Sequence, residues 1–432
     1  MFRKAKAALA FSLAAVMMAS TLTACKSGSA SSSGSSSSSS TPSSSSAAPK
    51  DITLTLWGSQ DDQAMLKTMA DNFTKTHTDN NYTIKLGVCG EDVAATTVLK
   101  DVDAAGDVFA FASDQLATLQ TAGALLPITI DTDKIKSDNT AASVTAATVD
   151  NQLYAYPSSA DTYFLYYDKK YLKDSDVTSL ENIMSKQLPS GVKNFAMNLN
   201  NNGWYVASFF LAAGCKVFGQ SGTDPTQCDF NSANGLTGAT YMLSLVSQKS
   251  KFVDWGANFD SLLAQNFKNR TIAAAVSGTW NAAKIQQALG SDFGATKLPT
   301  IKLGGKDTQM GSFANFKLYG VNAHSKNPAA AMALAEFLTN QDNQKIRFEQ
   351  RSFAPTNTAL SSDSSALASN VAVAADALQN KYATLQPSIK QMSNFWTPVG
   401  SLGTTMENGK TTSATLQKDL DNMVKSVLAK LS

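Results

Sequence analysis

The segment ITLTLWGSQDDQAMLKTMADNF (residues 52–73) places a strand, a turn and a helix in succession. Residues 52–57 alternate apolar and other side chains, as a strand does. Apolar side chains from Ala64 to Phe73 then recur at helical spacing and form one face. A strand that feeds directly into a helix is the first unit of an α/β fold.

Two more strand patterns extend this unit. They occupy residues 82–88 (YTIKLGV) and 107–112 (DVFAFA), and a helical stretch at 92–104 lies between them. The order strand, helix, strand, helix, strand predicts a parallel sheet with right-handed crossovers. Ligands of such sheets gather at the carboxyl ends of the strands, here residues 57–59 and 111–114.

The remainder of the chain continues the α/β pattern with more helix. Strand patterns occur at 154–157, 163–167, 272–277 and 317–321. Helical patterns occur at 204–213, 232–247, 280–289, 328–339 and 414–431. The length after residue 50 suits two domains of ordinary size.

The amino terminus predicts export and anchoring. Residues 1–24 combine early cations, an apolar run too short to span a bilayer and small residues before a cleavage point, which is typical of a signal peptide. Leu-Thr-Ala followed by Cys25 resembles the lipobox of bacterial lipoproteins, where the thiol carries diacylglycerol. An ordinary secretory cleavage site is the alternative. The serine-rich stretch 25–50 has too few apolar side chains to fold, so we expect a flexible tether.

Charge and reactive side chains exclude several classes of function. Three of the 36 basic residues and none of the 34 acidic ones lie in the signal peptide, so the exported chain has a net charge of −1. Without a basic excess, nucleic acid is not an expected partner. His77 and His324 have no neighbouring ligand pattern, and we expect neither a metal nor a cofactor.

The three cysteines after Cys25 have different expected roles. Cys215 and Cys228 bracket a segment that resembles two short edges around a Ser-Gly-Thr-Asp-Pro turn, and we expect them to form a disulfide. Two reduced, partly buried thiols are the alternative. Cys89 ends a strand pattern and is expected to be a small buried hydrophobe.

Five local motifs, in order along the chain, resemble extracellular solute-binding proteins of carbohydrate ABC transporters, of the maltose-binding type. They are residues 54–58 (LTLWG), 106–109 with 113–115 (GDVF, SDQ), 153–157 with 165–169 (LYAYP, LYYDK), 275–280 (AVSGTW) and 391–396 (QMSNFW). The resemblance implies a two-lobe α/β fold of the type II periplasmic-binding-protein class. It implies one lobe of residues 51–158 with 318–367, another of 162–312 with 370–432, and a first crossing at 159–161.

The resemblance also implies that a sugar binds in a cleft between the lobes. Aromatic faces stack on the C–H side of a pyranose, while polar side chains take its hydroxyls. The positions implied to contact the ligand are Trp57, Ser59, Asp61, Phe111, Asp114, Gln115, Asp161, Trp204, Trp280 and Trp396.

Structural roles remain open for several of these positions. Core packing is the alternative for each tryptophan, and Trp57 could lie beneath the ligand loop; Trp255, which no motif supports, is expected to be structural. Helix N-capping is the alternative for Asp61 and Asp114. Asp62 and Gly400 replace basic residues of known maltodextrin binders, so maltose itself is not implied.

The predicted function is therefore that of a lipid-anchored, non-enzymatic, monomeric receptor. It would deliver a sugar or oligosaccharide to the permease subunits of an ABC transporter on the extracellular face of the membrane, in a cell expected to be Gram-positive. The first alternative is a surface glycoside hydrolase, which needs two carboxylates at a set separation. The second is a two-lobe receptor for a polyamine or for ferric ion, the iron being suggested by Tyr163, Tyr166 and Tyr167.

Overall fold

The computed structural model describes residues 48–431. The predicted signal peptide, the lipidation site Cys25 and nearly all of the tether lie outside these residues. Within them, no helix has both the length and the apolar character needed to cross a bilayer.

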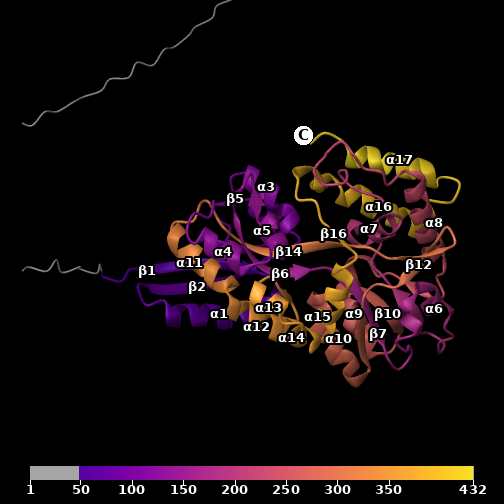
Figure 1. The fold of residues 1–432 in the computed structure, drawn as a ribbon, viewed down its shortest axis with the longest axis horizontal. Coiled ribbons are helices and arrows are strands. Elements are labelled where there is room, and N and C mark those ends of the chain that lie inside the picture. Colours follow the sequence, from indigo (N-terminus) through magenta and orange to yellow (C-terminus); the bar gives the residue numbers. More distant parts are fainter. Residues whose placement is uncertain (1–47, 432) are drawn as a thin grey trace, which may run out of the picture. The chain divides into compact units, whose positions relative to one another are not determined.

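The first of two large sheets, sheet 1, contains the predicted parallel strands (Figure 1). β1 pairs in parallel with β2 and β3, as predicted, but β14 runs antiparallel to β3 and β6, so the sheet is mixed rather than parallel. The strand order is β15-β6-β14-β3-β1-β2, with β16 also on β14. The strands are β1 Asp51–Gly58, β2 Asn81–Val88, β3 Val108–Ala112, β6 Ala155–Asp161, β14 Ser312–Val321, β15 Ala354–Pro355 and β16 Ala383–Leu385.

Three long helices and several short ones pack around sheet 1. They are α1 Gln63–Thr76, α2 Ala94–Val98, α3 Leu116–Thr121, α4 Thr132–Asp138, α5 Ala141–Ala146, α11 Pro328–Thr339, α12 Gln341–Arg351, α13 Thr358–Ser362 and α14 Ser364–Ala368. The helix expected over 92–104 is only α2, because the chain turns from Leu99 onwards. Leu54, Phe73, Phe109 and Leu334 are fully buried in the core that these elements share.

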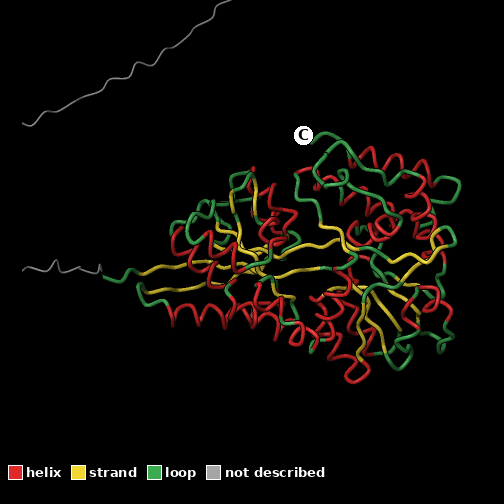
Figure 2. The backbone as a smooth tube through the Cα atoms, in the orientation of Figure 1, coloured by secondary structure: helices red, strands yellow, loops and turns green. Residues whose placement is uncertain are grey.

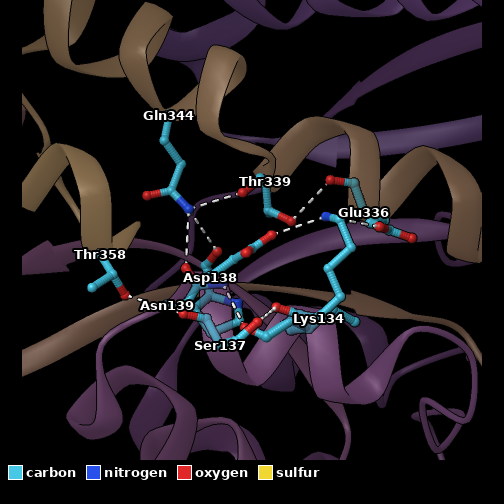
Figure 3. Close-up of polar contacts among 10 residues, drawn as sticks. Lys134, Ser137, Asp138, Asn139, Glu336, Thr339, Gln344 and Thr358 are labelled. Atoms are coloured by element: carbon cyan, nitrogen blue, oxygen red, sulfur yellow. Dashed lines mark hydrogen bonds and ion pairs between the residues drawn. The ribbon is translucent and has the colours of Figure 1, made fainter.

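A buried amide joins the helical layer to strand β6. Gln344 Nε2 donates to Thr339 O at 2.8 Å and to Asn139 Oδ1 at 3.2 Å, and it lies 3.4 Å from Pro157 O (Figure 3). Gln344 Oε1 accepts from the backbone N–H groups of Thr356 and Asn357 at 2.8 and 2.7 Å. One side chain therefore satisfies polar groups from several segments.

The second large sheet, sheet 2, has the order β11-β7-β10-β8-β9. Its strands are β7 Tyr163–Asp168, β8 Lys193–Ala196, β9 Phe252–Val253, β10 Ile272–Gly278 and β11 Phe293–Thr296. Its helices are α6 Leu180–Ser185, α7 Gly203–Ala212, α8 Ala233–Ser247, α9 Phe259–Lys268, α10 Ala282–Leu289, α15 Val371–Asn380, α16 Trp396–Glu407 and α17 Leu416–Val427 (Figure 2). The five predicted helical patterns are confirmed within a few residues at each end.

Smaller elements complete the described chain. Two hairpins are formed by β4 Thr148–Val149 with β5 Gln152–Leu153 and by β12 Thr300–Leu303 with β13 Lys306–Gln309. The 3-10 helices are η1 Gln60–Asp62, η2 Ser113–Gln115, η3 Asp176–Thr178, η4 Gly256–Asn258, η5 Thr279–Asn281, η6 Gly290–Asp292 and η7 Lys390–Asn394.

The chain passes between the two sheets at Thr162, which separates β6 from β7; residues 159–161, the predicted first crossing, are the last three residues of β6. Thr162 Oγ1 donates to Phe313 O at 2.7 Å and contacts Ser312 Oγ at 2.8 Å. Gln379 of α15 donates to the same Ser312 hydroxyl at 3.0 Å. The start of β14, the β6–β7 junction and α15 thus meet in one buried hydrogen-bonded group.

The expected disulfide is absent from the structure. Cys215 and Cys228 are both free thiols, although Val217 and Cys228 form the antiparallel bridge of the predicted hairpin. The residue opposite Cys228 is therefore Val217, while the sulfur of Cys215 lies 3.9 Å from Ser232 Oγ. Cys89 is buried, as expected.

Candidate functional site

A lysine within a buried strand organises the polar part of the site. The register of β14 against β6 shifts between Lys317 and Leu318, and such irregularities re-aim side chains. Lys317 Nζ lies 3.0 Å from Asp161 Oδ2, at the end of β6. Burial alone would lower the pKa of Lys317, but the carboxylates of Asp161 and Glu91 outweigh it and raise that pKa.

Glu91 approaches this lysine from the loop after β2. Burial raises the pKa of Glu91, Lys317 opposes the shift, and the charges of Asp62 and Asp161 add to it. Gln115 holds the loop, since its Nε2 donates to Glu91 O and its Oε1 accepts from the backbone N–H of Ala95, both at 2.6 Å. Gln115 is thus engaged within the protein and positions Glu91.

Asp114 lies in η2 at the carboxyl end of β3. Burial raises its pKa to about 6, against the hydrogen bond from Asn315 Nδ2 at 3.4 Å. Asn315 also donates to Gln386 Oε1 at 3.0 Å and accepts from the backbone N–H of Ser113 at 3.0 Å. These contacts fix a half-buried carboxyl group beside Lys317.

Two half-exposed tryptophans form an aromatic surface near these polar groups. The ring centroids of Trp204 and Trp396 are 6.3 Å apart, and both rings pack against Phe313, at 5.7 and 6.3 Å. Phe313 precedes Asn315, the partner of Asp114, by two residues in β14. The side chain of Asn202 caps the helix that carries Trp204 by accepting from the backbone N–H of Tyr205.

Trp280 follows β10 and lies flat over a glycine. A Cβ atom on Gly278 would be 1.9 Å from the indole Cζ3, so only glycine leaves room for this ring. The indole N–H donates to Asp260 Oδ1 at 3.4 Å, and Asn281 Nδ2 donates to the same oxygen at 2.6 Å. Asp260 is an exposed residue, but protein atoms around its carboxylate displace water and raise its pKa, while the hydrogen bonds from Trp280 and Asn281 and the charge of Lys284 oppose the shift.

An ion pair connects the elements of the two sheets beside Trp280. Lys284 Nζ of α10 lies 2.5 Å from Asp61 Oδ2 of η1. Asp61 and Asp114 are not helix N-caps, because Ser59 and Ala112 occupy those positions. The hydroxyl of Ser59 makes no capping hydrogen bond.

Phe111 is a correction to the predicted site. It is 0% exposed, packs against Phe109 with ring centroids 5.9 Å apart, and has no surface to offer a ligand. Trp57 is partly buried, and its ring lies against Gly87 in β2 and Gly106 just before β3. Trp255 packs against Phe259, at 5.3 Å.

The two departures from known maltodextrin binders have local causes. Asp62 is buried and accepts from Arg351 Nε at 2.6 Å. A Cβ atom on Gly400 would lie 2.6 Å from the backbone carbon of Asn201, so a longer side chain does not fit between these segments.

Sequence reasoning missed Glu91, Lys317, Asp260 and Lys284. Glu91 follows the carboxyl end of β2, and the rule that predicts ligand contacts at the ends of β1 and β3 applies to this strand end as well. Lys317 is the one charged residue of β14, and a charge within an otherwise apolar or neutral strand was the available signal. Asp260 and Lys284 lie on exposed helical turns and had no comparable signal.

Known proteins resemble this chain over most of its length. Residues 68–375 match the family described as bacterial extracellular solute-binding protein. A galactooligosaccharide-binding protein of Bacillus subtilis is 30% identical over 314 residues, covering 70% of this chain and 72% of the relative. A maltooligosaccharide ABC transporter solute-binding lipoprotein of Streptococcus pneumoniae is 24% identical, covering 74% and 76%.

Solved structures share the fold. One determined with acarbose has a TM-score of 0.80 at 32% identity and covers 87% of this chain and 98% of its own. Maltodextrin binding protein MalE1 from L. casei BL23, without ligand, has a TM-score of 0.75 at 28% identity and covers 88% and 100%.

Proposed function

Because the chain belongs to the family of bacterial extracellular solute-binding proteins, we propose that it binds an oligosaccharide and delivers it to the permease of an ABC transporter. Its fold is the two-lobe α/β type expected from the sequence. We propose that the lobes comprise residues 51–158 with 318–367 and 162–312 with 370–432, and that they close on the ligand by a hinge motion at Thr162.

The observation that carries this proposal is the half-exposed aromatic surface beside the polar groups around Lys317. Trp204 and Trp396 pack on Phe313, whose strand also holds Asn315 and Lys317. A pyranose presents C–H bonds on its faces and hydroxyls at its rim, and this arrangement offers partners for both. The relatives whose names mention galactooligosaccharide and maltooligosaccharide support a saccharide ligand.

Each site residue then has a proposed role. Trp204, Trp280 and Trp396 stack on sugar rings. Hydroxyls are bound by side chains with free donor or acceptor capacity, namely Ser59, Glu91, Asp114, Asp161 and Lys317. Gln115 positions Glu91, and Asp61 acts mainly through Lys284.

We propose that Cys25 carries the lipid and that the tether leaves the receptor on the extracellular face of the membrane. The relative from S. pneumoniae named a lipoprotein supports this anchoring. The permease subunits are the expected partners, and the receptor acts as a monomer.

The proposal includes the absence of catalysis. The hydrolase alternative fails if purified protein releases no reducing sugar from oligosaccharides that it binds. A ferric site at the three tyrosines is not supported, because the hydroxyls of Tyr163, Tyr166 and Tyr167 each make a hydrogen bond within the protein. Their partners are Ser208 Oγ, Gly278 O and Asp174 Oδ1, respectively.

Calorimetric titration of the exported chain from residue 26 with α-1,4-glucotriose and β-1,4-galactotriose tests the function. Binding should quench or shift tryptophan emission and raise the melting temperature, since a ligand at 100 times its Kd stabilises a protein by about 2.7 kcal/mol. Trp280→Leu should weaken binding at least several-fold, while Trp255→Leu serves as the matched control. No heat and no thermal shift with either series would refute the proposal.

A further inference from the structure

Each cation at the site already has its own carboxylate. Lys317 lies 3.0 Å from Asp161, Lys284 lies 2.5 Å from Asp61, and Arg351 Nε lies 2.6 Å from Asp62. These three pairs are each close to neutral, and none of them leaves a net positive charge for an anionic ligand group.

Three further carboxylates at the site have no such partner. Within residues 48–431, no lysine, arginine or histidine lies at ion-pair distance from Glu91, Asp114 or Asp260. The side-chain donors to Asp114 and Asp260 are neutral, namely the amides of Asn315 and Asn281 and the indole of Trp280.

These carboxylates share one electrostatic environment. The charge of Lys317 acts on both Glu91 and Asp114, and the exposed Asp92 acts on both Lys317 and Asp260, where the charge of Lys284 opposes it. The groups come from the loop after β2, from η2 and from α9, so the excess negative charge extends from sheet 1 to the elements around Trp280.

We propose that the site selects its saccharide by charge: it accepts uncharged or amine-bearing saccharides and excludes those that carry a carboxylate, sulfate or phosphate. This inference rests on the proposed function. Glu91, Asp114 and Asp260 are the residues that determine the selectivity.

Coulomb's law gives the expected size of the effect. Three unit charges about 10 Å from a ligand charge in water change Kd by about tenfold, unfavourably for an anion and favourably for a cation. The Debye length is about 30 Å at 0.01 M salt and about 8 Å at 0.15 M, so the effect is largest at low salt.

The test compares each of two trisaccharides in three forms at pH 8, which is above the raised pKa of about 6 of Asp114. α-1,4-Glucotriose and β-1,4-galactotriose are each reduced to the alditol, oxidised to the aldonate or reductively aminated to the 1-amino-alditol, and Kd is measured calorimetrically at 0.01 and 0.15 M salt. We expect the aldonate to bind about tenfold more weakly than the alditol at low salt, and the amine at least as tightly. At 0.15 M salt the difference between the Kd values of the aldonate and the alditol should be smaller.

Charge-removing variants separate electrostatics from shape. Glu91→Gln and Asp114→Asn should each narrow the aldonate–alditol gap, whereas Asp307→Asn, on an exposed hairpin with 69% of its side chain accessible, should leave it unchanged. A gap below twofold in the unmodified protein overturns the inference while the alditol still supports the proposed function. The inference is also overturned if the ratio of aldonate to alditol Kd changes neither with salt nor in the two variants, because the cause would then be steric. If no form of either sugar binds, the function and the inference both fail.

Discussion

Gly278→Ala is the substitution that most directly tests whether the Trp280 ring faces a ligand. Gly278 lies at the end of β10 in extended backbone, which alanine adopts without strain. The added methyl group would lie 1.9, 2.4 and 2.5 Å from three indole carbons. The change therefore acts on the ring and not on the backbone.

The size of the displacement follows from these distances. Ordinary contacts begin at 3.4 Å, so the ring must move by about 1.5 Å away from the strand. Overpacking of this kind costs about 1–3 kcal/mol of stability. An aromatic stacking interaction is worth about 0.5–1.5 kcal/mol, so its loss should raise the saccharide Kd by roughly 2- to 13-fold.

Calorimetry with the bound trisaccharide, together with chemical denaturation, measures both effects. Gly294→Ala is the matched control, because its methyl group would lie 2.5 Å from the ring of Tyr167, whose hydroxyl contacts Asp174 away from the site. That control should lose stability and keep its affinity. A Gly278→Ala protein with an unchanged Kd would refute the stacking role of Trp280.

Three other outcomes follow from the structure. Since the pKa of Asp114 is raised to about 6, its contribution to stability is present in acid and is lost as the pH rises through about 6. Asp114→Asn should therefore flatten that part of the pH profile of stability measured by urea denaturation. An unchanged profile would contradict the raised pKa of Asp114. Asp61→Lys and Lys284→Asp should each weaken saccharide binding by a few-fold, as expected of an exposed ion pair worth about 0.2–1 kcal/mol. The double variant should bind as tightly as the unmodified protein in calorimetry. If it does not, the ion pair is absent from the bound form. Gln344→Leu leaves two buried backbone N–H groups unpaired, and each should cost about 1–3 kcal/mol of stability. The melting temperature of this variant should fall well below that of Asp342→Asn, the control on the same helix. Equal melting temperatures would contradict the role of Gln344.

Local patterns predicted the first part of the fold well. Residues 52–88 contain their own strand, turn and helix signals, and β1 pairs with β2 along its whole length. The mixed character of sheet 1 was not predictable in the same way. The antiparallel neighbour of β3 begins at Ser312, about 200 residues later, and pairing at that separation leaves no local signature.

The site shows the same division between local and distant information. Trp280 was predicted from the small residues before it, and the structure explains that signal through Gly278. Phe111 was misassigned because every residue of the VFAFA strand is buried, so alternation could not reveal which face it occupies. The Lys317–Asp161 pair joins two strands that lie far apart in the sequence, and no local residue pattern predicts which strands pair.

The placement of β14 also affects how the chain folds as it is made. This strand lies between β3 and β6, so these two strands cannot join in one sheet until residue 321 has been synthesised. At about 5–20 residues per second, the wait after β3 is roughly 10–40 s. An export machinery that threads unfolded polypeptide would have that interval to engage the nascent chain, so we expect late delivery of one central strand to keep this receptor competent for secretion.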